Sequence, residues 1–127
     1  MTLEIRENNG GIPFQSIDWT SIQTVEHKGE QGSSQCKTIQ YPGLRIRMVD
    51  YSSGYSADHW CQAGHFVHCL EGEFSIELVP SGIFEFKGGD GFIVSDGLSS
   101  HRILSQSGGK LLIVDGDFLK PNKTLSQ

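Results

Sequence analysis

The chain has 127 residues, a formal net charge of -5 at neutral pH and 36% hydrophobic residues. This length suits one domain that buries about two thirds of its unfolded surface in a single core. The acidic balance argues against a nucleic-acid partner, because phosphate binding normally needs a basic face. We therefore expect an acidic, single-domain protein with no nucleic-acid partner.

Two further features bear on location. No window approaches the roughly 18 apolar residues of a membrane span, and the first residues lack the apolar run of a signal peptide. Cys36, Cys61 and Cys69 are odd in number and unevenly spaced, which suits a reducing compartment better than a disulfide framework. We expect a cytoplasmic protein with no membrane partner.

Residues 1–24 are interpreted as an N-terminal arm. Its apolar part runs from Ile12 to Trp19, and Pro13 keeps this segment out of a central strand. Residues 25–35 are charged and rich in Gly and Ser, which is typical of a loop. The arm and the edge strands of an open barrel offer two surfaces that a second chain could cover, so we expect a homodimer.

Strand signals follow at short intervals. Residues 37–41 and 44–51 meet at a Pro42-Gly43 type II turn, and residues 73–79 and 83–87 form a second predicted hairpin. Residues 91–95 read as a strand, and residues 101–105 are expected to pair with 110–115. Many short strands without a helical period are typical of a sandwich or barrel. The sequence predicts one all-β barrel over residues 25–120 and a tail over residues 121–127.

Residues 44–51 alternate apolar and charged side chains, so one face is buried. The pattern favours Leu44, Ile46 and Met48 as core residues, with Arg45 and Arg47 facing solvent or a dimer interface. The alternative places both guanidinium groups inside the barrel, where they could hold a substrate carboxylate bidentately.

A cluster of histidines and cysteines stands out between residues 54 and 72. His59 and Cys61 are two residues apart, so on a strand their side chains leave the same face. Gly64 allows a bend that brings His65 back to the same point, and His101 can add a fourth ligand from a later segment. Imidazole and thiolate together suit zinc best, and iron, nickel and copper also accept them.

This spacing resembles the motifs of the cupin family. The first motif, Gly-x5-His-x-His-x3,4-Glu-x6-Gly, appears here as Gly54-x4-His59-x-Cys61-x3-His65-x6-Gly72. The second, Gly-x5-Pro-x-Gly-x2-His-x3-Asn, appears as Gly89-x5-Ser95-x-Gly97-x3-His101-x3-Ser105. The departures replace the second histidine by Cys61 and the glutamate by His65, and insert one residue before His101.

A narrower resemblance lies in Asp58-His59-Trp60-Cys61, which is similar to the small bacterial DHCW-motif cupins with Trp and Cys in reverse order. The resemblance implies a jelly-roll barrel, also called a double-stranded β-helix, with a metal position. It implies no particular reaction, because cupins include enzymes and non-catalytic sensors.

Three functions stay open at this point. The leading hypothesis is a metal-binding cupin that acts on a small polar metabolite through His59, Cys61, His65 and His101. The second is a non-catalytic metal- or metabolite-binding sensor with a closed, structural metal site. The third needs no metal and uses Cys61 as a nucleophile with His59 or His65 as base. Tyr55 could donate a proton near the barrel mouth, although a partly buried packing role suits it better.

Overall fold

The computed structural model describes residues 11–121. Its regular structure there consists of β-strands and two short 3₁₀ turns: η1 (Trp19–Ser21), β1 (Val25–Lys28), β2 (Ser33–Tyr41), β3 (Leu44–Tyr51), β4 (Tyr55–Ser56), β5 (His65–Val79), β6 (Gly82–Lys87), β7 (Gly91–Val94), β8 (Ser100–Ser105), β9 (Gly109–Gly116) and η2 (Asp117–Leu119). No helix in these residues is long and apolar enough to cross a membrane. Most of the predicted tail and the first ten residues of the predicted arm lie outside the described residues.

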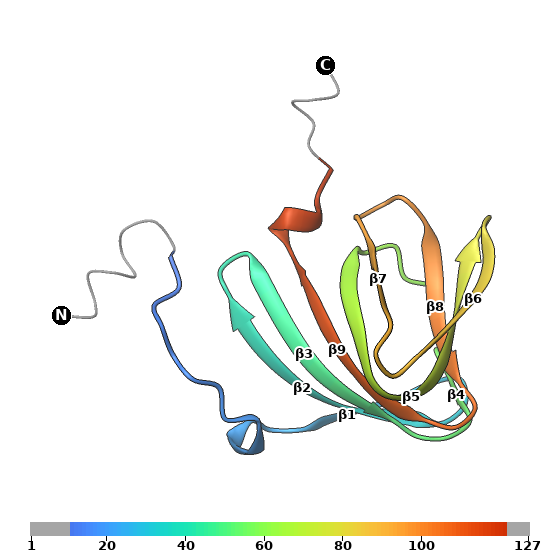
Figure 1. Ribbon diagram of the computed structural model, residues 1–127, viewed down its shortest axis with the longest axis horizontal. Coiled ribbons are helices and arrows are strands. Elements are labelled where there is room, and N and C mark those ends of the chain that lie inside the picture. The colour runs from blue at the N-terminus through green and yellow to red at the C-terminus, as the bar shows by residue number, and fades with distance from the viewer. Residues whose placement is uncertain (1–10, 122–127) are drawn as a thin grey trace.

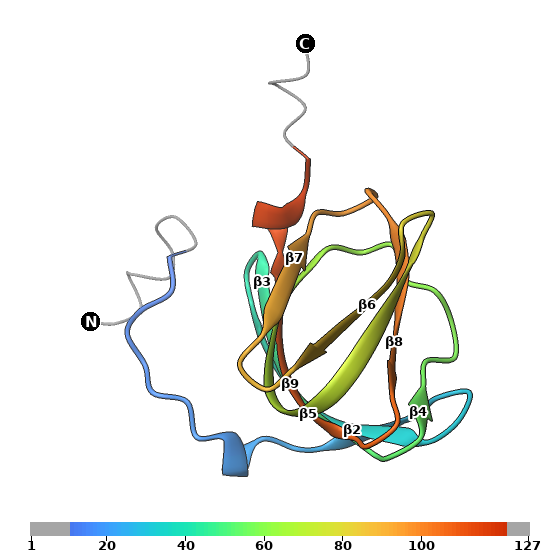
Figure 2. The ribbon, with the colours of Figure 1, turned by 45° about the vertical axis from the view of Figure 1, so that its right-hand side comes forward.

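The strands curl into a barrel in which the long strand β5 pairs with more strands than any other described strand (Figures 1 and 2). The first part of β5 pairs with β7 and β9, in the sheet that continues through β3 and β2 to β1. The second part of β5 pairs with β6 and β8, and β8 also pairs with β4. The prediction of an all-β barrel is confirmed.

Two predicted hairpins are confirmed, and one is wrong. β2 pairs with β3 across Gly43, whose φ of 69° fits the predicted turn, and β5 pairs with β6. β8 and β9 do not form a hairpin, because β8 pairs with β4 and β5 while β9 pairs with β3 and β5. The chain crosses between the sheets at Gly108, where φ is 81°.

The predicted loop over residues 25–35 is also wrong, because it contains β1 and the start of β2. All four residues of β1 are exposed. An edge strand exposed on both faces needs no alternation of apolar and polar residues, so its sequence carries no strand signal.

The apolar core fills one end of the barrel interior. It is built from buried side chains of β2, β3, β5, β6 and β9, namely Cys36, Val49, Val67, Cys69, Phe74, Ile76, Phe86, Leu111 and Ile113. Aromatic rings of Phe74, Phe86 and Tyr51 pack against one another within it, with centroids 5.3 to 5.5 Å apart. Burial of this set is the main source of stability.

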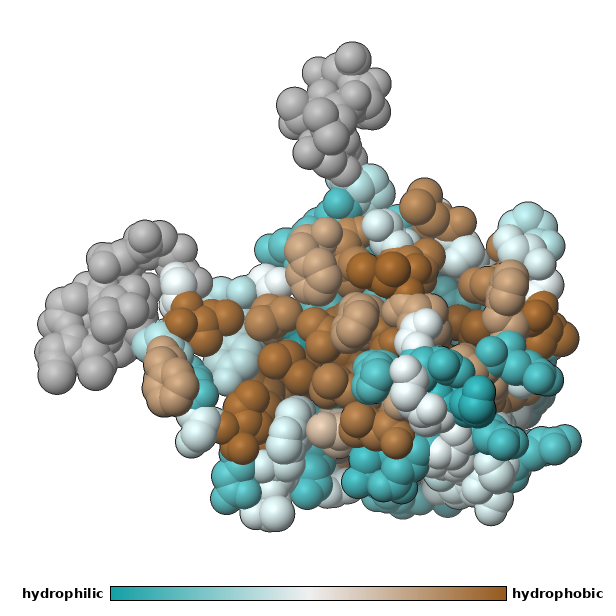
Figure 3. Space-filling view, viewed as in Figure 1, coloured by the Kyte–Doolittle hydropathy of each residue, from teal (hydrophilic) through white to brown (hydrophobic). Residues whose placement is uncertain are grey.

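The predicted orientation of β3 is wrong. Val49 belongs to the core, and because side chains alternate along a strand, Arg47 and Arg45 share its inward face. Leu44, Ile46 and Met48 lie on the outer face. There Ile46 pairs with Ile39 and Val114, so apolar residues cover the outside of the sheet, as the brown band in Figure 3 shows. A β-sheet usually turns its apolar face to the core and its polar face to solvent. At this end of β3 the arrangement is reversed, with apolar side chains outside and arginines inside.

The apolar arm extends away from the barrel beyond η1 (Figure 1). Phe14 is 99% exposed. The arm is held by the Lys37 ammonium, which donates to the Trp19 carbonyl at 2.9 Å, and by the Tyr41 hydroxyl, which donates to Gln15 Oε1 at 2.9 Å. The homodimer expected from the sequence stays a prediction.

β5 changes partners beside Gly72, just after a register shift between Cys69 and Glu71. Gly72 has a φ of 90°, and a Cβ built there would collide with the Gly108 carbonyl oxygen. A side chain would therefore meet both backbone strain and a steric clash.

We expect Gly72→Ala to lower the free energy of unfolding by roughly 2 kcal/mol or more, measured by urea denaturation. Gly89→Ala is the matched control. Gly89 has a φ of 97°, but its Cβ would meet nothing within 4 Å, so only the backbone strain of about 1 kcal/mol applies. Equal losses in the two variants would contradict close packing at the β5 corner.

Candidate metal centre

Three side chains that can bind a metal converge at the end of the barrel interior opposite the core. They are Cys61, His65 and His101, and their ligand atoms all lie within 4.8 Å of one another. His65 is the first residue of β5 and His101 lies on β8. Cys61 is held against β8 because its backbone N–H and C=O exchange hydrogen bonds with those of His101 at 2.8 and 2.9 Å. Two backbone hydrogen bonds therefore fix the spacing of thiol and imidazole.

The geometry of these groups fits a metal ion. Cys61 Sγ lies 3.6 Å from His65 Nε2, and the rings of His65 and His101 lie edge to face at 5.4 Å. Both ring nitrogens of His101 are buried and have no hydrogen-bond partner among the described residues. A buried polar nitrogen without a partner is costly, and coordination to a metal would satisfy it. Thiolate and imidazole are the donors that zinc and similar ions prefer.

Burial and nearby charge keep both imidazoles neutral. Burial, reinforced by the positive charge of Arg47, lowers the pKa of His65 to about 4. Burial also lowers the pKa of His101. Neutral imidazole is the form that binds metals, so the site is prepared for coordination at neutral pH.

Asp115, on β9, is the site residue that the sequence analysis missed. Its Oδ2 lies 3.4 Å from His65 Nδ1, although the two atoms form no hydrogen bond in the observed geometry. A carboxylate at this place is suited to orient a ring that would carry a metal on Nε2. Burial alone would raise the pKa of Asp115, but hydrogen bonds from Arg45 and the charges of Arg47 and Arg45 lower it. The sequence did contain a sign of this role. Asp115 has the same strand parity as Leu111 and Ile113, so it points inward, where an unpaired carboxylate would be costly.

A backbone contact positions the segment that precedes β5. The N–H of Gly64 donates to Asp96 Oδ1, which ties the residue before His65 to the chain beyond β7. A Cβ at Gly64 would lie 2.6 Å from the Asp96 nitrogen, so this close approach requires glycine. The bend expected from Gly64 therefore occurs, and its cause is contact with a neighbouring segment.

The structure does not bring His59 to the cluster. Its side chain is 76% exposed, and its Nδ1 lies 2.7 Å from Asp58 Oδ1. Residues 58 and 59 form a bend rather than a strand. The argument that His59 and Cys61 share a face requires a strand, and it fails for this physical reason.

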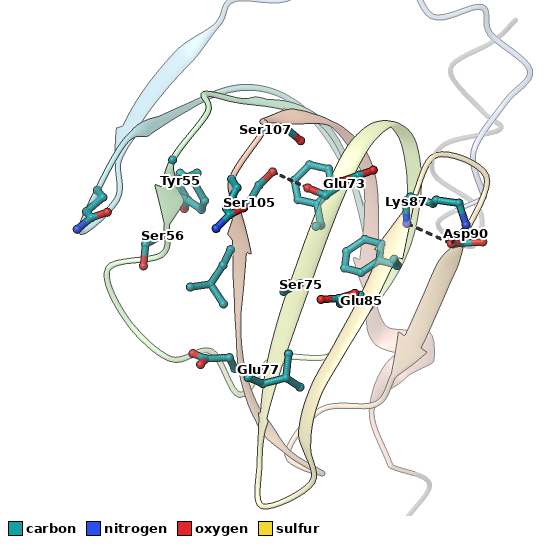
Figure 4. A pocket seen from close by; sticks show the side chains of 17 residues that line it. Tyr55, Ser56, Glu73, Ser75, Glu77, Glu85, Lys87, Asp90, Ser105 and Ser107 are labelled. Carbon is teal, nitrogen blue, oxygen red and sulfur yellow. Dashed lines mark hydrogen bonds and ion pairs between the residues drawn. The ribbon is translucent and has the colours of Figure 1, made fainter.

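Tyr55 also lies away from the cluster. It pairs with Ser105 on β8, and its ring packs edge to face on Tyr51 at 4.8 Å. Burial raises its pKa. Tyr55 also borders a hollow of about 820 Å³ between β4, β5, β6 and β8, which Figure 4 shows together with the carboxylates of Glu73, Glu77 and other residues. None of the three clustered ligands lines this hollow.

A smaller hollow of about 380 Å³ lies at the metal-centre end of the barrel. Arg45, Gly64 and Asp115 contribute to its wall. Cys61, His65 and His101 do not line this hollow, but Asp115 lies in its wall and also contacts His65. Its size falls within the range of about 300–1,000 Å³ that is typical of small-molecule sites.

No family model matches the chain, and no curated protein matches it by sequence. Solved structures do resemble it. An RmlC-like cupin from Shewanella frigidimarina has a TM-score of 0.62 at 19% identity, covering 82% of this chain and 91% of that one. Ectoine synthase from P. lautus has a TM-score of 0.67 at 14% identity, covering 89% and 83%. A cupin-superfamily sugar phosphate isomerase from Silicibacter pomeroyi has a TM-score of 0.64 at 14% identity, covering 81% and 76%.

At these identities the likeness establishes the fold and leaves the reaction open. The narrower resemblance to DHCW-motif cupins stays a prediction. The chain has the fold of the cupin superfamily, as the spacing of its motifs predicted.

Proposed function

We propose that this chain is a metal-binding cupin-fold protein that acts on a small polar metabolite at a centre held by Cys61, His65 and His101. The observation that carries the proposal is the convergence of the three ligand atoms within 4.8 Å. The similar solved structures include a sugar phosphate isomerase and ectoine synthase, which supports small-molecule chemistry in this fold.

The ligand set favours zinc, with iron, nickel or copper as alternatives, because a thiolate beside two imidazoles is a soft donor set. When bound, such an ion would polarise an oxygen of the substrate. The protein's own contribution is to hold two neutral imidazoles and to place the Asp115 carboxylate 3.4 Å from His65 Nδ1.

The number of ligands supports a reactive site over a closed structural one. Within residues 11–121 the cluster contains three donor side chains, and His59 lies outside it. Structural zinc sites are normally closed by four protein ligands, whereas catalytic sites keep a position open. A sensor with a closed structural metal is therefore the weaker candidate.

A thiol site without metal is the second candidate function. The distance of 3.6 Å between Cys61 Sγ and His65 Nε2 would let His65 act as base for the thiol. The exposed His59 cannot take this role from its observed position. Rapid alkylation of Cys61 in chelator-treated protein, slowed in His65→Ala, would favour this candidate over the metal centre.

We expect purified, untagged protein to contain metal at near-stoichiometric amounts, and we expect Cys61→Ala, His65→Ala and His101→Ala each to lose most of it. The reason is that each variant removes one of three donors. Elemental analysis measures this outcome directly. His59→Ala is the matched control and should retain its metal, because His59 is exposed and outside the cluster.

Metal loss in His59→Ala alone, or an absence of metal from wild-type protein prepared under reducing, metal-replete conditions, would contradict the proposal. The second outcome would leave the thiol site as the better explanation of the cluster.

We expect Asp115→Asn to weaken metal binding about 10–100-fold, because carboxylates that orient a ligating histidine contribute on this scale. Titration against a chelator of known affinity measures the change. Asp50→Asn is the control, since Asp50 on β3 pairs with Lys110 at 3.7 Å and is largely exposed. An unchanged affinity in Asp115→Asn would show that the carboxylate does not support His65.

The depressed pKa of His65 also predicts how stability depends on pH. Between about pH 6.5 and 4 the unfolded chain binds a proton at His65 that the folded chain does not. The free energy of unfolding of metal-free protein should therefore fall by ~1–3 kcal/mol as the pH drops through this window.

Urea denaturation at several pH values measures this slope. His65→Gln should reduce it, and His59→Gln should leave it unchanged because that ring is exposed in both states. Equal slopes in wild type and His65→Gln would show that His65 is not buried in its neutral form.

A further inference from the structure

The inward face of the main sheet carries an arginine pair that the proposed metal centre does not use. Arg45 on β3 pairs with Asp115 on β9, and β9 lies beside β5, where His65 begins the strand. Arg47 lies two residues further along β3 toward the apolar core and pairs with the core residue Ile113 on β9. The two guanidinium groups therefore lie inside the barrel between the apolar core and the cluster of Cys61, His65 and His101.

The positive charge of this pair exceeds what the protein neutralises locally. Two guanidinium groups share one carboxylate, that of Asp115. The Asp117 carboxylate pairs with Lys120, and the Asp96 carboxylate accepts the Gly64 N–H. Asp96 keeps its negative charge at the rim, so the excess of one positive charge is confined to the arginine pair and the single carboxylate that it shares.

The hydrogen bonds show which guanidinium group is short of acceptors. Arg45 binds both oxygens of Asp115, with Nε to Oδ1 at 3.1 Å and Nη2 to Oδ2 at 2.7 Å. Arg47 has only a long contact of 3.4 Å from Nη2 to the same Oδ2. Its Nε is buried and has no acceptor among the described residues, although the side chain as a whole is 22% exposed. A guanidinium group has five donors and seldom stays buried without acceptors.

The neighbouring hollow opens beside Arg45, and Arg47 does not line it. Its wall includes Arg45 and Asp115, and Arg45 is 41% exposed. Asp96 and Asp117 also line it, so the rim is not uniformly positive. This arrangement favours a single planar anionic group that reaches the guanidinium groups, and it disfavours multiply charged anions such as phosphate.

We propose that the ligand of this site is a small monocarboxylate whose anionic group is bound by Arg47 and Arg45. The proposal rests on the proposed function, since the rest of the ligand would then lie toward Cys61, His65 and His101. It names the substrate class as organic acids, and it assigns Arg47 and Arg45 to substrate binding rather than to the surface.

Isothermal titration calorimetry on purified protein of known metal content tests this proposal. The probes are acetate, glycolate and lactate, each with its uncharged amide, together with inorganic phosphate. We expect at least one carboxylate to bind at least about 10-fold more tightly than its amide and than phosphate, because a charge-assisted bidentate contact contributes on this scale.

The same carboxylate should bind about 10-fold or more weakly to Arg47→Gln. Arg47→Lys keeps the charge but loses the planar fork, so it should also bind more weakly, and it serves if the Gln variant does not fold. Arg102→Gln is the matched control. Arg102 is 25% exposed but pairs with Glu77 at 2.6 Å and lies on the opposite face of β8 from His101, so its loss should not change carboxylate affinity.

The outcomes separate this inference from the metal proposal, because metal content is measured independently on each sample. Metal-loaded protein that binds no carboxylate, binds acid and amide equally, or prefers phosphate would overturn the inference and leave the metal centre intact. Carboxylate binding that is unchanged in the folded Arg47 variants would also overturn it. Metal-free protein that still binds carboxylate through Arg47 would support the anion site while removing the metal centre.

Discussion

The polar end of this barrel depends on one carboxylate. Asp115 accepts two hydrogen bonds from Arg45, contacts Arg47 and lies 3.4 Å from His65. Charged groups inside a barrel are costly unless they are paired and hydrogen-bonded. By neutralising one guanidinium and lying beside one imidazole, Asp115 allows β3, β9 and β5 to present polar side chains inward where a barrel usually presents apolar ones.

The interior is thereby divided along its length. Val49, Leu111 and Cys69, on the same three strands, fill one end and supply the apolar core. The opposite end holds the arginine pair and the Cys61, His65 and His101 cluster. Ligands of this cluster come from both sheets, so folding of the whole barrel is needed to assemble it. The same strands therefore contribute apolar side chains to the core at one end of the barrel and polar side chains to the cluster at the other.

The cupin fold by itself does not choose a reaction, because structurally similar proteins include a sugar phosphate isomerase and ectoine synthase. The choice depends on side chains that the fold leaves free to vary. Here these are a cysteine where the cupin motif has histidine, a histidine where it has glutamate, and two inward arginines beside them. A cluster of one thiol and two imidazoles next to an inward arginine pair is a specific combination, and it defines the chemistry to be tested.

The sequence by itself determined the barrel and two of its hairpins, because alternation, turn residues and motif spacing are local signals. Of the four side chains predicted to meet at one site, it named the three that do lie together. Only the tertiary structure decided the rest. His59 leaves the cluster because its segment bends, Arg45 and Arg47 turn inward because Asp115 compensates them from β9, and β8 and β9 separate into different pairings. Each of these depends on contacts between segments distant in sequence, and such contacts leave no periodic pattern in the chain.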